Sequence, residues 1–137
     1  MNIFRRLLFW LGVITLIHFP ITGALMKYNV FHIDQDNITV RMMFRANHIY
    51  IVMAGLVNML LYFATKDISG RWLLQLASLI LLASTVTLNI AFYFDPVGGT
   101  LQRQFTAFSV IGVFAGTLIS LLYLQFSKKK PEKELTK

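Results

Sequence analysis

Residues 72–94 read WLLQLASLILLASTVTLNIAFYF and contain no charged side chain. A bilayer core about 30 Å thick is crossed by roughly 20 apolar residues in helical form, because each residue adds about 1.5 Å along the axis. A helix is the expected form, since backbone groups in lipid must find hydrogen-bond partners within their own segment. This stretch therefore predicts a transmembrane helix.

Three further stretches have the same length and apolar character. The four predicted spans are residues 3–26, 46–65, 72–94 and 104–126. The ten-residue segments of alternating polarity that form membrane β-barrels do not occur in the sequence. We therefore predict an all-α integral membrane protein, a four-helix transmembrane bundle. It would form a single domain over residues 1–127, followed by a basic cytoplasmic tail at residues 128–137.

The overall composition agrees with a membrane protein. Of the 137 residues, 56% are hydrophobic and 14% are charged, whereas soluble domains carry about 25% charged residues. The net charge of +7 comes mostly from basic residues that flank the apolar stretches. That placement indicates topology and contact with anionic lipid headgroups, so we expect the lipid bilayer as a partner and no nucleic acid. Because the chain has no cysteine, disulfides and thiolate metal sites are excluded.

The basic residues are divided unevenly between the two faces of the predicted bundle. Lysine and arginine are retained on the cytoplasmic side of a membrane. The face with both termini has Arg5, Arg6, Lys66, Arg71, Lys128, Lys129, Lys130, Lys133 and Lys137, and the other face has Lys27, Arg41, Arg45 and Arg103. The sequence therefore predicts a multi-pass protein of a bacterial-type inner (plasma) membrane with both termini in the cytoplasm.

The first span has an alternative interpretation as a cleaved signal peptide. It has a basic start, an apolar run over residues 7–17, and small residues at Thr22 and Ala24. Cleavage would leave three helices. The apolar stretch continues to Met26, which is long enough to span a membrane and favours a retained helix.

Small and polar residues recur inside the spans. Gly112, Gly116 and Ser120 occupy every fourth position of the last span, which is the small-residue pattern of a helix contact. The pattern does not say whether the partner helix belongs to this chain or to another. Asn47 and Asn58 in the second span and Asn89 in the third form, with His18, a candidate intramembrane polar site.

His18 is an ionisable residue inside the first span, and such residues are candidates for function. His18 and His48 could provide the two axial ligands of one haem b. Their predicted depths differ by about 7 Å at the helical rise per residue, which is awkward for an upright haem. A haem site is therefore one alternative, and packing of a neutral histidine is the other.

Arg41, Arg45 and His48 are spaced by four and three residues, so they share one stripe if the second helix begins near residue 39. Together with Arg103 they form a candidate seat for an anionic lipid or a small anion, because guanidinium groups suit phosphate and carboxylate. Alternatively, these arginines pair with aspartates on the same side, Asp34, Asp36 and Asp95. Asn37 or Asp36 could cap this earlier helix start.

Motifs of catalysis are missing from the sequence. It contains no HExxH, no Walker loop and no GxGxxG, and the four spans contain no Asp or Glu. We therefore expect a non-enzymatic protein, first of all an accessory or interaction subunit that contacts other subunits of a membrane complex. The alternatives are a single-haem b electron carrier, and a binder or carrier of an anionic lipid or small anion at the Arg and His stripe.

Overall fold

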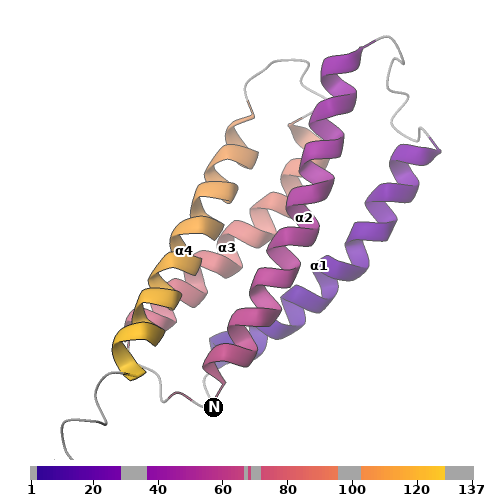
Figure 1. Ribbon diagram of the computed structural model, residues 1–137. Coiled ribbons are helices and arrows are strands. Elements are labelled where there is room, and N and C mark those ends of the chain that lie inside the picture. The colour runs from indigo at the N-terminus through magenta and orange to yellow at the C-terminus, as the bar shows by residue number, and fades with distance from the viewer. Residues whose placement is uncertain (1–2, 29–36, 67, 69–71, 96–102, 129–137) are drawn as a thin grey trace, which may run out of the picture.

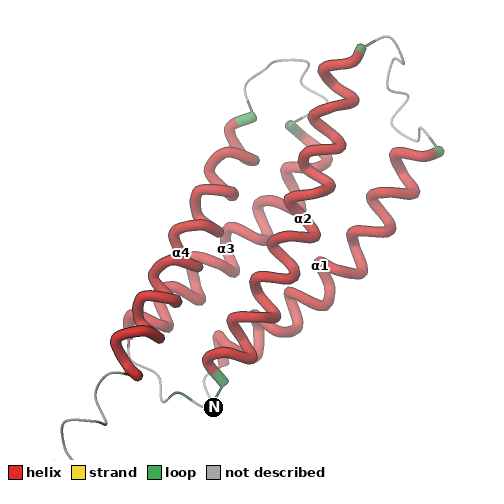
Figure 2. Tube along the Cα trace, in the orientation of Figure 1, coloured by secondary structure: helices red, strands yellow, loops and turns green. Residues whose placement is uncertain are grey.

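A computed structural model describes residues 3–28, 37–66, 68, 72–95 and 103–128. The helices are α1 (Ile3–Lys27), α2 (Ile38–Thr65), α3 (Trp72–Phe94) and α4 (Gln104–Lys128). All four run lengthwise along one bundle (Figure 1), and every regular element in the described ranges is helical (Figure 2). Each of the 4 helices is long and apolar enough to cross a membrane. The predicted all-helical bundle of four candidate membrane spans is thus confirmed.

The helices form two close pairs. α1 packs mainly against α2, and α4 packs mainly against α3. α3 joins the two pairs through its contacts with α1 and α2, whereas α2 has few contacts with α4. We call the end where α1 and α3 finish and α2 and α4 begin the distal end, which is uppermost in Figure 1. The opposite, proximal end holds the start of α1 and the finish of α4.

The second helix begins earlier than the predicted span, at Ile38 instead of residue 46. The cap expected at Asn37 is present, because its side chain accepts a hydrogen bond of 3.1 Å from the backbone N–H of Val40. The extra turns contain the exposed Arg41 and Arg45. A search for apolar stretches alone does not find them, although the capping signal is present in the sequence.

A glycine contact lies inside each close pair. A Cβ atom at Gly116 of α4 would lie 2.7 Å from Leu81 Cγ and 3.1 Å from the carbonyl oxygen of Ala77, both on α3. A Cβ atom at Gly12 of α1 would lie 3.0 Å from the carbonyl oxygen of Gly55 on α2. Both crossings therefore depend on a missing side chain, as is common for helices in membranes.

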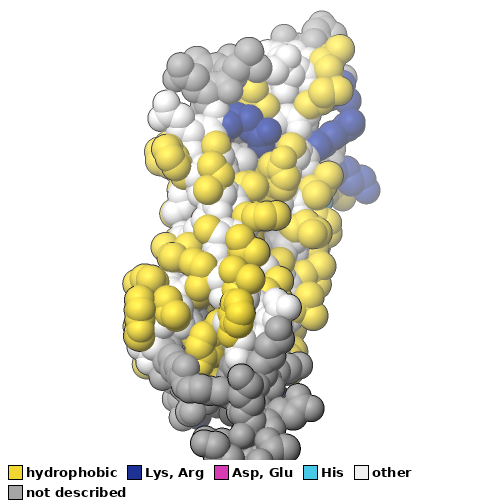
Figure 3. All heavy atoms as spheres, turned by 60° about the vertical axis from the view of Figure 1, so that its left-hand side comes forward, with side chains coloured by type: hydrophobic (Ala, Val, Ile, Leu, Met, Phe, Trp, Pro, Cys, Tyr) yellow, Lys and Arg dark blue, Asp and Glu magenta, His cyan; other side chains and the backbone are white. Residues whose placement is uncertain are grey.

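The surface of the bundle is apolar, and its buried part contains many polar residues. Phe108 and Phe114 on α4 are 72% and 75% exposed, and Figure 3 shows apolar side chains over much of the described part of one face. In the same view, basic side chains lie toward the upper, distal end. Apolar cover of this extent suits contact with lipid rather than water.

Candidate functional site

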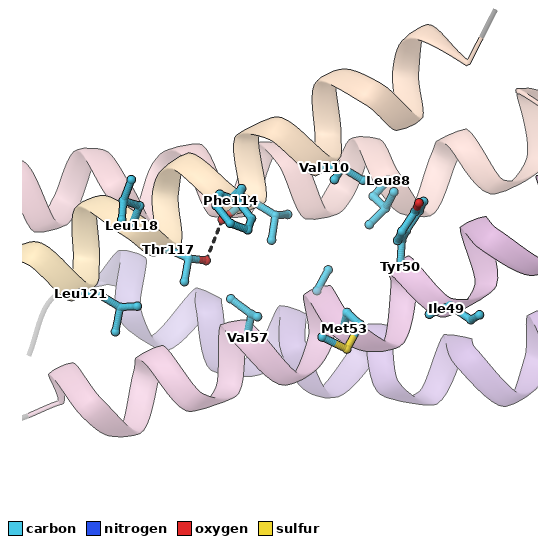
Figure 4. Close-up of a pocket in the computed structure, with 12 residues that line it drawn as sticks. Ile49, Tyr50, Met53, Val57, Leu88, Val110, Phe114, Thr117, Leu118 and Leu121 are labelled. Carbon is cyan, nitrogen blue, oxygen red and sulfur yellow. Dashed lines mark hydrogen bonds between the residues drawn. The ribbon is translucent and has the colours of Figure 1, made fainter.

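An apolar groove lies between α2 and α4, which make few contacts with each other (Figure 4). Its volume is about 560 Å³, which is in the range of sites for small ligands. Thr117 brings a hydroxyl, but this hydroxyl donates a hydrogen bond of 2.6 Å to the carbonyl oxygen of Val113 on its own helix. The groove is lined by Ile49, Tyr50, Met53, Ala54, Val57, Leu88, Val110, Val113, Phe114, Thr117, Leu118 and Leu121. It therefore offers mostly hydrocarbon to an occupant.

The groove extends along the helices over part of the membrane thickness. On α4 it runs from Val110 to Leu121, which is about 16 Å at the helical rise per residue. On α2 it runs from Ile49 to Val57, or about 12 Å. Tyr50 lies toward its distal end, since α2 begins there.

A buried polar cluster lies at the distal end of the same helices. Asn47 of α2 is fully buried, and its amide Nδ2 donates to the carbonyl oxygen of Ala91 on α3 at 3.3 Å. Its Oδ1 accepts a hydrogen bond from Nη2 of Arg103 and lies 3.1 Å from the hydroxyl of Thr106. We call Asn47, Asp95, Arg103 and Thr106 the distal cluster. It joins α2, α3 and α4.

Asp95 holds the start of α4 in place. Its Oδ2 accepts the backbone N–H of Thr106 at 2.7 Å and the hydroxyl of Thr106 at 2.6 Å. The first turn of a helix leaves N–H groups unpaired and favours a negative charge, so a carboxylate from α3 caps α4. The Thr106 hydroxyl has one hydrogen, and the shorter distance to the carboxylate indicates that it is donated to Asp95.

Arg103 connects the distal cluster to the groove. Its guanidinium carbon lies 6.0 Å from the ring centroid of Tyr50, a residue of the groove wall. Its Nε is buried without a hydrogen-bond partner. A positive charge therefore lies beside the distal end of the groove wall.

The predicted anion seat does not form as one unit. His48 faces α1, where its Nδ1 lies 2.9 Å from the Thr22 hydroxyl and its ring stacks on Phe19 with centroids 4.0 Å apart. Arg41 and Arg45 follow the same stripe and are exposed. Arg103 instead contacts Asn47 and Tyr50, which lie on the side of α2 toward α3 and α4.

The candidate intramembrane polar residues fall into separate places. His18 of α1 lies between Asn89 and Tyr93 of α3, with distances of 2.6 Å from Nδ1 to Asn89 Oδ1 and 2.6 Å from Nε2 to the Tyr93 hydroxyl. Asn58 instead donates from Nδ2 to the Thr85 hydroxyl at 2.9 Å, and its Oδ1 is buried without a partner. Asn47 belongs to the distal cluster.

The haem b alternative gains no support from this geometry. An axial ligand needs one ring nitrogen free to bind iron, but both nitrogens of His18 are engaged with α3. The ring of His48 packs against α1, with Cε1 3.2 Å from the position of a Cβ atom on Gly23. In the described ranges, no group of three His, Cys, Asp or Glu side chains is placed to hold a metal ion.

Three features were missed by the sequence analysis. The groove depends on how α2 and α4 diverge, which a single sequence does not reveal. The role of Asp95 as a cap of α4 is the second feature, although Asp95 directly follows one span and Thr106 lies in the first turn of the next. Arg5 was assigned only to topology, but it is 4% exposed and donates to the carbonyl oxygens of Thr65 and Ile68 at the finish of α2.

No family model, no curated protein and no solved structure matches this chain, so its own geometry is the basis for assigning a function.

Proposed function

We propose that this chain is a multi-pass protein of a bacterial-type inner membrane that binds an anionic phospholipid. One acyl chain would lie in the α2–α4 groove, with the headgroup at Arg103. The observation that carries this proposal is the apolar groove whose distal end lies beside the positively charged Arg103 guanidinium, 6.0 Å from the ring of Tyr50 in the groove wall. With both termini in the cytoplasm, the lipid would come from the outer leaflet.

The length of the groove favours an acyl chain over a partner helix. A transmembrane helix packs along most of the roughly 30 Å bilayer core. At the helical rise per residue, the groove runs for only about 16 Å along α4, from Val110 to Leu121. Val110 is in the distal half of this helix. A flexible hydrocarbon chain fits a site of this length and needs no polar partner inside it.

The charge of the distal end favours an anionic headgroup. Guanidinium binds phosphate through paired hydrogen bonds, and Arg103 stands at the correct end of the groove. Asp95 in the same cluster is turned to α4, where its Oδ2 accepts two bonds from Thr106. Lys27, Arg41 and Arg45 add positive charge at the distal end.

The accessory-subunit hypothesis remains a prediction, but one of its arguments weakens. Gly112 and Gly116, the small residues expected to meet another helix, pack against α3 of the same chain. Ser120 is buried and donates to the carbonyl oxygen of Gly116 at 2.8 Å. A contact with another subunit would therefore have to use a different surface.

Groove binding is tested by native mass spectrometry after purification from nanodiscs of phosphatidylglycerol and phosphatidylcholine. Thr117→Phe fills the groove and should lower the number of retained lipids of either type several-fold. Ile111→Phe adds similar bulk at a residue of α4 that is 65% exposed and outside the groove, so it is the control. Equal lipid retention in these two variants would refute binding in the groove.

Headgroup recognition is tested separately in the same nanodiscs. Arg103→Gln should reduce the preference for phosphatidylglycerol and leave the total lipid count nearly unchanged. Arg45→Gln removes the same charge from the other side of α2 and is the matched control. If both variants lose the preference equally, distal charge in general attracts the lipid and Arg103 has no special role.

A further inference from the structure

The hydrogen bonds of Asn89 determine which nitrogen of His18 has a hydrogen. The carbonyl oxygen of Thr85 can only accept, and it lies 2.8 Å from one terminal atom of the Asn89 amide, which must therefore be Nδ2. The same atom lies 3.3 Å from the Thr15 hydroxyl. Asn89 Oδ1 is then the atom 2.6 Å from His18 Nδ1, so Nδ1 must donate. This assignment comes from the network of partners.

The other ring nitrogen of His18 faces a group that can reverse its role. In the neutral ring, Nε2 has no hydrogen and accepts from the Tyr93 hydroxyl at 2.6 Å. In the protonated ring, Nε2–H would donate to the same oxygen, and the hydroxyl hydrogen would turn away. Both charge states are thus satisfied without movement of a heavy atom.

We propose that His18 is a proton-binding site within the bundle, loaded from the distal side through Tyr93. Tyr93 lies next to Phe94, the last residue of α3, and is partly exposed. Its hydroxyl would pass its hydrogen to Nε2 and take a proton from a hydronium ion on the distal side, which is left as water. Tyr93 is then neutral again, and one proton from the distal solution is on His18. This proposal is independent of lipid binding.

The hydrogen-bond partners of the His18 ring are Asn89 and Tyr93. α1 packs against α2 and α3, and neither span contains an acidic residue. The titratable group of α2 at this level is His48, which is turned to Thr22. The other described charged groups of these elements lie toward the two ends. Lys27, Arg41, Arg45 and Asp95 are at the distal end, and Arg5, Arg6 and Lys66 are at the proximal end. The Asn89 and Tyr93 oxygens therefore stabilise the imidazolium.

Protonation would strengthen the contact between α1 and α3. Hydrogen bonds from a charged donor are shorter and stronger than those from a neutral one, and His18 forms two bonds from α1 to α3.

Nitrogen NMR of the full chain in nanodiscs, with labelled imidazole rings, tests the proposal. The signals are assigned with His32→Gln and His48→Gln variants. The His18 ring should be the neutral Nδ1–H form at neutral pH and become doubly protonated on acidification. An Nε2–H form at neutral pH, or no protonation down to about pH 4 in a folded protein, would overturn the proposal.

A substitution of the hydroxyl tests the role of Tyr93. Tyr93→Phe removes the acceptor for Nε2–H in the charged ring and the donor to Nε2 in the neutral ring. Because the bond of the charged ring is stronger by about 1 kcal/mol, the ratio of protonated to neutral His18 at a given pH should fall about fivefold. Tyr28→Phe is the control, because Tyr28 is at the same end and 71% exposed. An unchanged ratio in Tyr93→Phe would exclude this residue as the proton partner. If Tyr93→Phe does not fold, the wild-type ring form still decides the proposal.

Discussion

The substitution Gly116→Leu tests the tight contact between α3 and α4. Already the Cβ atom would lie 2.7 Å from Leu81 Cγ, and 3.1 Å from the carbonyl oxygen of Ala77. Leu81 is fully buried, so its side chain has little room to turn. The carbonyl belongs to the helix backbone and cannot rotate away. The two helices must therefore separate to admit a leucine.

The expected loss of stability follows from two opposing effects. Extra carbon atoms in a packed interior cost about 1–3 kcal/mol. Replacing glycine by leucine in a helix returns up to about 1 kcal/mol, because the unfolded glycine has more freedom to lose. Because the Ala77 carbonyl cannot move aside, the packing cost should lie near the upper end of its range, and the free energy of unfolding should fall by about 2 kcal/mol.

The measurement is an unfolding titration with sodium dodecyl sulfate, followed by circular dichroism. Ile111→Leu is the matched control, because it places leucine on the same helix at a site that is 65% exposed. Gly112→Ala gives a second comparison, since the new methyl group meets the movable Ser84 side chain and should cost less. Equal unfolding free energies for Gly116→Leu and Ile111→Leu would refute the close contact.

Two further predictions concern the proximal end and the orientation. Arg5→Ala should lower the free energy of unfolding by about 1.5–3 kcal/mol, as for bonds to a charged donor, because carbonyl oxygens at the finish of α2 lose their partner. In the same titration the exposed Arg6→Ala should change it by less than about 0.5 kcal/mol, and equal losses would contradict the assigned role of Arg5. Reporter fusions after Lys137 and within residues 29–36 should report opposite sides of the membrane, with Lys137 cytoplasmic. A periplasmic signal from Lys137 would reverse the orientation.

The positions of the helices could be predicted from the sequence because they depend on a local property, the length of each apolar stretch. The span at residues 72–94 coincides with α3, and the start of α4 at Gln104 was also expected. Length and apolarity decide both, since the bilayer forces the backbone into helices. The start of α2 differed from the predicted span because its first turns are polar, and there the cap at Asn37 was the better guide.

The candidate site was predicted only in part, because it depends on which faces of the helices meet. Residue spacing predicts one stripe for Arg41, Arg45 and His48, but spacing cannot say that His48 lies against Thr22 and Phe19 of α1. It also cannot show that Arg103, distant in sequence, bonds to Asn47 on another face of α2. Nor can it reveal a groove, which exists where side chains of two helices fail to meet.

The arrangement of contacts explains why the groove lies where it does. Glycine crossings close the α1–α2 and α3–α4 pairs, and backbone oxygens within them limit further approach. The joint between the pairs is made through α3, by His18 and Asn58 among others, whereas α2 and α4 have few contacts. We propose that an acyl chain lies between α2 and α4, and there it would contact both pairs without breaking either crossing.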